Sequence, residues 1–163
     1  MSAISAVLTS PSVERVRQAL ERAGVSAEIV ELPGAARTAK AAAGFLGCGL
    51  AQIANSLVFR AAASDQAVLV MSSGAQRVDT AKLAALVGEP IGKADAEFVR
   101  RHTGFAIGGV APVGHSLKQV FVERNLSRHG ELWAAGGHPH TVFRLSYPDL
   151  VRITGGVPAE LAA

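Results

Sequence analysis

The stretch "TGFAIGGVAPVGHSL", residues 103–117, contains four glycines, one proline and one histidine. Gly108, Gly109, Pro112 and Gly114 leave little backbone that could pair in a central strand, so the stretch predicts a rigid loop. In such a loop, backbone amides can approach a ligand without side chains in the way. The residues alone leave open whether the loop only turns the chain or also binds something.

A second glycine-rich turn, "AAGGHPHT" at residues 134–141, also follows an apolar run and also joins small residues to a histidine. If both loops lie at the same end of a sheet, they would frame a pocket with exposed amide donors. Such donors suit a carbonyl oxygen that becomes an oxyanion, or a phosphate. A small-ligand pocket and two purely structural loops remain equally open at this point.

The segments around these loops predict short helices and paired strands. Helices are expected at residues 10–23, 39–47, 80–88 and 95–102 and from Ser146 onward, with Ser10, Thr38, Asp79 and Ser146 as capping residues. Strands are expected at residues 26–32, 56–61, 66–71, 118–124, 131–135 and 140–145. This order predicts an α/β (α+β) fold with a mixed sheet and flanking helices. No linker, repeat or low-complexity tract divides residues 1–163, so we expect a single domain.

Composition narrows the class of protein. Hydrophobic residues make up 49% and charged residues 18%, a globular balance. No apolar run approaches the roughly 20 residues needed to span a bilayer, and no basic segment precedes the first apolar stretch, so we expect a mature cytoplasmic protein without a membrane partner. Cys48 is the only cysteine, which excludes an internal disulfide. The net charge of +3 is compatible with a polyanionic partner without requiring one.

Other site signals in the sequence are weak. Gly47 and Gly49 supply only half of a dinucleotide fingerprint, and no strand ends before them, so a helix stop is predicted. Nothing marks Cys48 as an activated nucleophile. His138 and His140 are two residues apart but lack a third ligand, so no metal site is expected. Without a G-x-S-x-G elbow, a serine-triad hydrolase is not expected either.

Three segments together carry a family resemblance: "RTAKAAAGFLGCGLAQIANSLVF" at 37–59, "GFAIGGVAPVGH" at 104–115 and "WAAGGHPHTVFRLSYPDLVRITG" at 133–155. In this order and spacing they resemble the YbaK/prolyl-tRNA-synthetase-associated domain family. The match extends over nearly the whole chain, and the G-G-V-x-P-x-G segment is its most specific part.

The resemblance implies a partly barrel-like mixed sheet and a trans-editing activity. Members of this family hydrolyse the ester between a wrong amino acid, of alanine, cysteine or serine type, and a tRNA such as proline tRNA. The implied partner is the acylated 3′ end of the tRNA, with a synthetase as a further candidate; no DNA is implied, and monomer and homodimer stay open. No metal or organic cofactor is implied. Attack comes from a water assisted by the substrate's own hydroxyl, or from the substrate thiol in the cysteine-specific branch.

The resemblance also assigns residues. Asn55 and the amides of Gly108 and Gly109 take the catalytic positions. The implied substrate-binding residues are Ser56, Ser73, Pro112, Gly114, His115, Gly136, Gly137 and His138.

One of these positions departs from the family pattern. Members commonly carry a lysine in a motif like I-V-K-S/T-L-V-F, whereas "IANSLVF" places Asn55 there. A neutral amide replaces a full charge, and the loss of a charge-assisted contact costs on the order of a few kcal/mol. This leaves two alternatives: a module that binds tRNA, a synthetase or an amino acid without catalysis, and a general small-ester or amide hydrolase. Asn55 could also simply cap the start of a strand.

Overall fold

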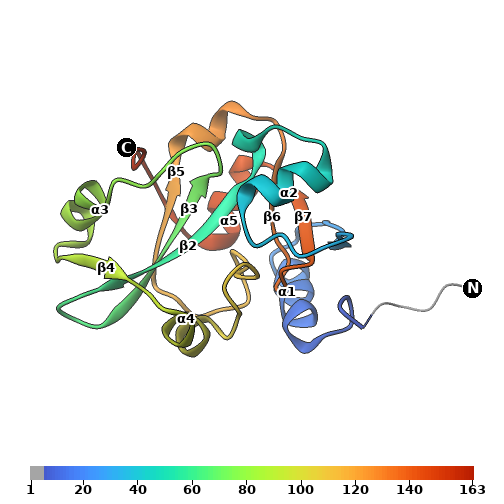
Figure 1. Cartoon of the computed structure of the whole chain (residues 1–163), viewed down its shortest axis with the longest axis horizontal. Helices are drawn as coiled ribbons and strands as arrows, with labels where there is room; N and C mark the ends of the chain where they lie inside the picture. Colours follow the sequence, from blue (N-terminus) through green and yellow to red (C-terminus); the bar gives the residue numbers. More distant parts are fainter. Residues whose placement is uncertain (1–5) are drawn as a thin grey trace, which may run out of the picture.

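The computed structural model describes residues 6–163 (Figure 1). Its helices are α1 (Pro11–Arg22), α2 (Ala39–Leu46), α3 (Thr80–Val87), α4 (Ala96–Thr103) and α5 (Tyr147–Thr154), with short 3-10 helices at Leu50–Gln52 and Arg124–Arg128. Its strands are β1 (Val30–Glu31), β2 (Ala54–Ala61), β3 (Gln66–Ser73), β4 (Ile91–Lys93), β5 (Gln119–Glu123), β6 (Leu132–Ala135), β7 (Thr141–Leu145) and β8 (Val157–Ala159).

The strands form two sheets. The larger has the order β4-β2-β3-β5-β8, in which β2 runs antiparallel to β3 and β4, while β3, β5 and β8 are parallel. The smaller has the order β1-β7-β6 and is antiparallel. A single bridge between Ile53 and Trp133 links the two. The predicted mixed sheet with flanking helices is therefore confirmed, but within residues 6–163 the strands do not close into a barrel.

Polar side chains begin four of the five helices, and three of these caps, all but Asp95, were predicted from the sequence. The side chains of Thr38, Asp79, Asp95 and Ser146 each accept a hydrogen bond from a backbone amide in the first turn of α2, α3, α4 and α5. Ser10 is different, because its side chain makes no capping hydrogen bond at α1. At that end Pro11 supplies a backbone angle already suited to the first helical position.

The core consists mainly of one cluster that reaches from α1 into both sheets. It includes Val16 of α1, Leu69 and Met71 of β3, Leu132 of β6 and Phe143 of β7, all fully buried or nearly so. The alternate residues of β3 point to the opposite face, where a second cluster lies beneath α3. Because β3 is buried on both faces, it reads as a continuous apolar run rather than an alternating one.

The structure corrects several predicted boundaries. Only Val30–Glu31 of the predicted strand at 26–32 is paired. The 3-10 helix Arg124–Arg128 lies between the predicted strands at 118–124 and 131–135, and these two strands belong to different sheets. Strand β3 also continues through Ser73, two residues beyond the predicted strand at 66–71.

Within residues 6–163, no helix has the length and apolar character needed to cross a bilayer. The expected absence of a leader rests in part on residues 1–5, which lie outside the described residues.

Candidate functional site

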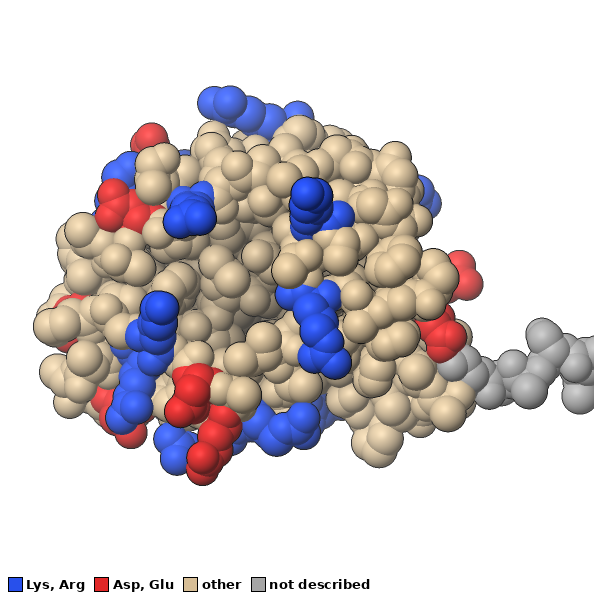
Figure 2. Space-filling model, in the orientation of Figure 1, with Lys and Arg blue, Asp and Glu red and all other residues tan. Residues whose placement is uncertain are grey.

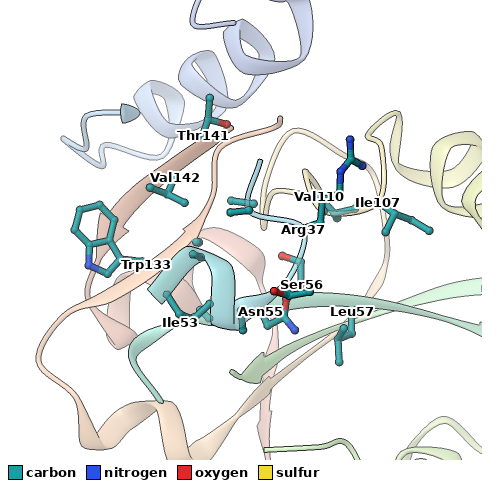
Figure 3. Close-up of a pocket in the computed structure, with 18 residues that line it drawn as sticks. Arg37, Ile53, Asn55, Ser56, Leu57, Ile107, Val110, Trp133, Thr141 and Val142 are labelled. Atoms are coloured by element: carbon teal, nitrogen blue, oxygen red, sulfur yellow. The ribbon is translucent and has the colours of Figure 1, made fainter. Parts of the chain in front are cut away.

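A cavity of about 130 Å³ lies where the two sheets diverge (Figure 3). Strand β2 pairs with β3 along its whole length, but its other edge is paired only at its two ends. One end forms the bridge from Ile53 to Trp133, and the other pairs with β4 from Phe59 onward. Between them, residues 54–58 have no strand partner on that edge within the described chain. The cavity occupies this gap.

Four segments close the gap. The walls come from β2 and the residue before it, from the segment that leads into α2, from the loop at 107–110 and from the smaller sheet. The lining residues are Ala36, Arg37, Thr38, Ala39, Ala42, Ile53, Ala54, Asn55, Ser56, Leu57, Ile107, Gly108, Val110, Trp133, Ala134, Ala135, Thr141 and Val142. None of them carries a carboxylate, an imidazole or a thiol.

Asn55 and Ser56 contribute the polar side chains of β2. As consecutive strand residues they project to opposite faces of the sheet. The Ser56 hydroxyl donates to the Met71 sulfur at 3.4 Å, on the side of the main core. The Asn55 side-chain amide forms no hydrogen bond with any residue in 6–163, so its donor and acceptor groups are available to a ligand.

Gly108 and Gly109, both predicted as amide donors, have different surroundings. Gly108 lines the cavity with φ +87°, and its amide donates to no residue within 6–163. The Gly109 amide already donates to the Ala106 carbonyl at 2.9 Å. A Cβ at Gly109 would lie 2.9 Å from the Cα of His138, so this glycine allows the two glycine loops to touch. The two loops do meet, and residues of both line the cavity as well as a second hollow.

The other predicted loop residues lie in two further hollows. Pro112, Gly114 and His115 border a hollow of about 550 Å³ beside α1. Gly137 and His138 border another of about 510 Å³. The loop at 103–117 therefore borders three separate spaces rather than one site.

Ser73 and Gly136 line none of these three spaces. The Ser73 hydroxyl accepts a hydrogen bond from the Ala75 amide at 3.3 Å, just beyond the end of β3. Gly136 is buried, and a Cβ there would lie 2.8 Å from the Ile29 side chain. Ser73 therefore stabilises a turn and Gly136 allows close packing, and neither residue lines the cavity.

Two histidines of the glycine loops have lowered pKa values. Burial lowers the pKa of His138, and nearby His140 and Arg37 lower it further, against the opposing effect of Glu31. Burial also lowers the pKa of His115, with the Pro112 carbonyl acting in the opposite direction. Both imidazoles are therefore mainly neutral at pH 7.

The described residues offer neither a metal centre nor an activated thiol. Within residues 6–163 there is no group of three or more His, Cys, Asp or Glu side chains that could hold a metal ion. Burial raises the pKa of the Cys48 thiol, the opposite of what a reactive cysteine requires.

Arg37 and Trp133 were not among the predicted site residues, yet both line the cavity. Arg37 is exposed and forms no ion pair with any described residue. Trp133 is a lining residue on another side of the cavity, at the bridge with Ile53 (Figure 3). Each residue begins one of the segments that carry the family resemblance, but that resemblance assigned neither a role. The bridge between β6 and the residue before β2 brings Trp133 to the site.

Comparison with known proteins agrees with this geometry. Residues 34–153 match the family model of the aminoacyl-tRNA editing domain. The chain is 28% identical over 124 residues to the uncharacterized protein YwhH of Bacillus subtilis (strain 168), covering 76% of this chain and 78% of that protein.

Solved structures show the same fold. A crystal structure of a candidate trans-editing enzyme for prolyl tRNA synthetase superposes with a TM-score of 0.87 at 44% identity, covering 94% of this chain and 98% of that one. The hypothetical protein APE2540, at 24% identity, shares the fold with a TM-score of 0.82 over 91% of this chain and 99% of its own. The resemblance seen in the sequence is confirmed, and the chain belongs to the aminoacyl-tRNA editing domain family.

Proposed function

We propose that this protein hydrolyses the ester bond of mischarged aminoacyl-tRNA, with the amino acid held in the cavity between β2 and the loop at 107–110. One observation carries the proposal: Asn55, Gly108 and Arg37 all line the cavity, and neither the Gly108 amide nor the Asn55 side-chain amide has a hydrogen-bond partner within residues 6–163. The first two groups can hold a carbonyl oxygen, and the guanidinium can meet the phosphate of an attached nucleotide.

The size and lining of the cavity favour a small amino acid. The cavity has a volume of about 130 Å³. Ile53, Leu57 and Val110 give part of the wall an apolar character. Alanine, serine and cysteine are therefore the proposed acyl groups, with proline tRNA as the first carrier to examine.

The lining also limits the mechanism. No lining side chain can act as a strong general base, and two of the hydroxyls are engaged: Thr38 accepts from the Ala41 amide, and Thr141 bonds to the His138 backbone. We therefore assign the activation of water to the substrate itself. Water adds to the ester carbon, the bond to the ribose oxygen breaks, and that oxygen takes up a proton. The products are a free amino acid and an uncharged tRNA.

In this scheme the protein positions the ester and stabilises developing charge. The Gly108 amide is the proposed donor to the carbonyl oxygen as it becomes an oxyanion, where one such donor is worth about 10²–10³-fold in rate. Asn55 offers a second, neutral donor at the position where the family commonly has lysine. A neutral donor stabilises the oxyanion less than a cation would.

The test is deacylation of proline tRNA charged with alanine, serine or cysteine. We expect turnover by the wild type, and a rate about 10- to 100-fold lower for Asn55→Ala because a polar contact to the ester is lost. Gln18→Ala, which removes an exposed amide on α1, is the matched control and should retain the wild-type rate.

Asn55→Lys separates catalysis from binding. If only Asn55→Lys turns over, the cavity is intact and the natural protein has a binding role, which would overturn the proposal. If neither protein acts on any of the three esters, the proposal is likewise overturned.

A further inference from the structure

A basic groove adjoins the candidate active cavity. It has a volume of about 510 Å³ and shares Arg37 with the cavity, so that residue stands between the two spaces. Its lining comes from the start of α1, from α4 and the residues after it, and from the second glycine loop. The residues are Ser12, Arg37, Arg100, Gly104, Phe105, Ala106, Gly137, His138, Pro139 and His140. We call this space the His138 groove.

The charges of the groove are of one sign. The charged lining residues are Arg37 and Arg100, and no lining residue is acidic. Neither arginine forms an ion pair with another residue in 6–163. Glu31 acts on His138 but is not part of the lining. Two guanidinium groups in one concavity without a protein carboxylate suit an anionic ligand.

His138 adds a neutral donor. Its Nδ1 accepts a hydrogen bond from the His140 amide at 3.0 Å, so the neutral ring carries its proton on Nε2. Ser12 places the first turn of α1 at the groove, and a helix N-terminus carries partial positive charge. The groove therefore offers several kinds of donor for phosphate oxygens.

The surface of the molecule is consistent with an approach by a polyanion from outside. Figure 2 shows one face hollowed near its centre, with Lys and Arg side chains around the hollow and Asp and Glu mainly toward the periphery. A single-stranded nucleic acid following such a surface is held mainly by its phosphates, without dependence on base sequence.

We infer that the His138 groove binds the phosphodiesters that precede the acylated nucleotide of the tRNA. This inference rests on the proposed function, because it takes the aminoacyl group to lie in the cavity. The terminal ribose must then lie at the mouth beside Arg37. The strand leading to it continues from Arg37 toward Arg100 and His138. Recognition here is of the single-stranded end, through its backbone.

The experiment measures binding of an uncharged acceptor-stem RNA hairpin that carries its single-stranded 3′ end, by fluorescence anisotropy at low salt. Arg100→Gln should raise the Kd about ten-fold, because a charge-assisted contact to a phosphate is lost. It should also make the dependence of log Kd on log salt shallower by about 0.7. Arg128→Gln, which removes an exposed arginine on the 3-10 helix at Arg124–Arg128, is the matched control and should leave both quantities unaltered.

A blunt hairpin without the single-stranded 3′ end shows whether the groove binds the phosphates of that end or those of the duplex. It should bind more weakly to the wild type, and Arg100→Gln should then weaken binding no further. An equal loss on both hairpins would place Arg100 against the duplex and overturn the inference. An effect of Arg100→Gln no larger than that of Arg128→Gln would also overturn it.

Failure of the inference can be told from failure of the proposed function. The hairpin is uncharged, so its binding needs no hydrolysis. Wild-type deacylation together with no groove effect would leave the function standing without the groove. A groove effect without deacylation of any ester would leave a binding module that uses the groove.

Discussion

Gly108 and Gly109 are adjacent in the chain but serve different purposes. Gly108 has a left-handed backbone and presents an unused amide beside the cavity. Gly109 has an ordinary backbone angle. A glycine is needed there because the backbone of His138 leaves no room for a Cβ. Of the two adjacent glycines, Gly108 therefore offers an amide to a ligand, and Gly109 allows the two loops to pack together.

Gly109→Ala should destabilise the protein. The added Cβ would lie 2.9 Å from the Cα of His138 and 3.0 Å from Pro139, and neither backbone can easily move. Overpacking of this kind costs about 1–3 kcal/mol of unfolding free energy, measured by urea denaturation. Gly130→Ala is the control, since a Cβ there meets nothing within 4 Å. Equal stability of the two variants would show that the loops can separate freely.

At the same scale, part of the site could be predicted and part could not. Asn55, Ser56 and Gly108 were predicted and do meet at one cavity. Asn55 and Gly108 come from distant segments, and a family pattern rather than local periodicity united them. Arg37 was missed because an exposed arginine before a helix looks the same in sequence whether or not it borders a cavity.

At the scale of elements, one buried carboxylate helps to hold residues 161–162 in place. Glu123, at the end of β5, is 2% exposed. Its two oxygens accept hydrogen bonds from the amides of Leu161 and Ala162, each at 3.1 Å. This contact holds the segment after β8 against the larger sheet, where Leu161 completes the second core cluster.

Glu123→Ala should loosen that segment and destabilise the fold. Two backbone donors lose their acceptor, at a cost of roughly 1–3 kcal/mol for each that stays buried. We expect faster hydrogen exchange at the amides of Leu161 and Ala162, and a lower midpoint of urea unfolding. Glu160→Ala removes an exposed carboxylate nearby and should change neither measurement. Unchanged exchange in Glu123→Ala would mean that the packing of Leu161 and the backbone hydrogen bonds to Arg77 and Asp79 are enough to hold the segment.

The elements that sequence reasoning missed are the short ones at the sheet margins. β4 and β8 have three residues each and contain Gly92 and Pro158, which weaken any strand signal. They are strands because β2 and β5 offer them an unpaired edge. The predicted long strand at 26–32 shows the opposite case, since β7 pairs with only two of its residues. Long apolar strands such as β3 were predicted because their burial is visible in their composition.

At the scale of the whole molecule, the two sheets share one core. The cluster around α1 contains residues of β3 from the larger sheet and of β6 and β7 from the smaller. Neither sheet can lose this packing without exposing the other. The main sheets are therefore expected to unfold together.

Trp133 allows this to be measured, because it is the only tryptophan and reports on the smaller sheet. Its fluorescence and the far-UV circular dichroism should follow one urea transition. Phe143→Ala removes a fully buried ring and should lower both midpoints together, with a loss of about 3–5 kcal/mol. Phe45→Ala, at a ring that is 42% exposed, should cost much less. A fluorescence change that precedes the dichroism change would show that the smaller sheet melts separately.

The contacts at Gly109 have a consequence for how this site can change over evolutionary time. The loop is anchored by backbone packed against backbone, whereas the cavity beside it is bounded partly by Ile107, which is 46% exposed, and by the half-buried Leu57. Substitutions at such positions usually alter stability by little. A lineage can therefore enlarge or narrow the space beside β2 by exchanging these two side chains while the anchored loop stays in place. In this chain, the side chains that determine the size of the cavity can therefore change independently of the contacts that hold the loop in place.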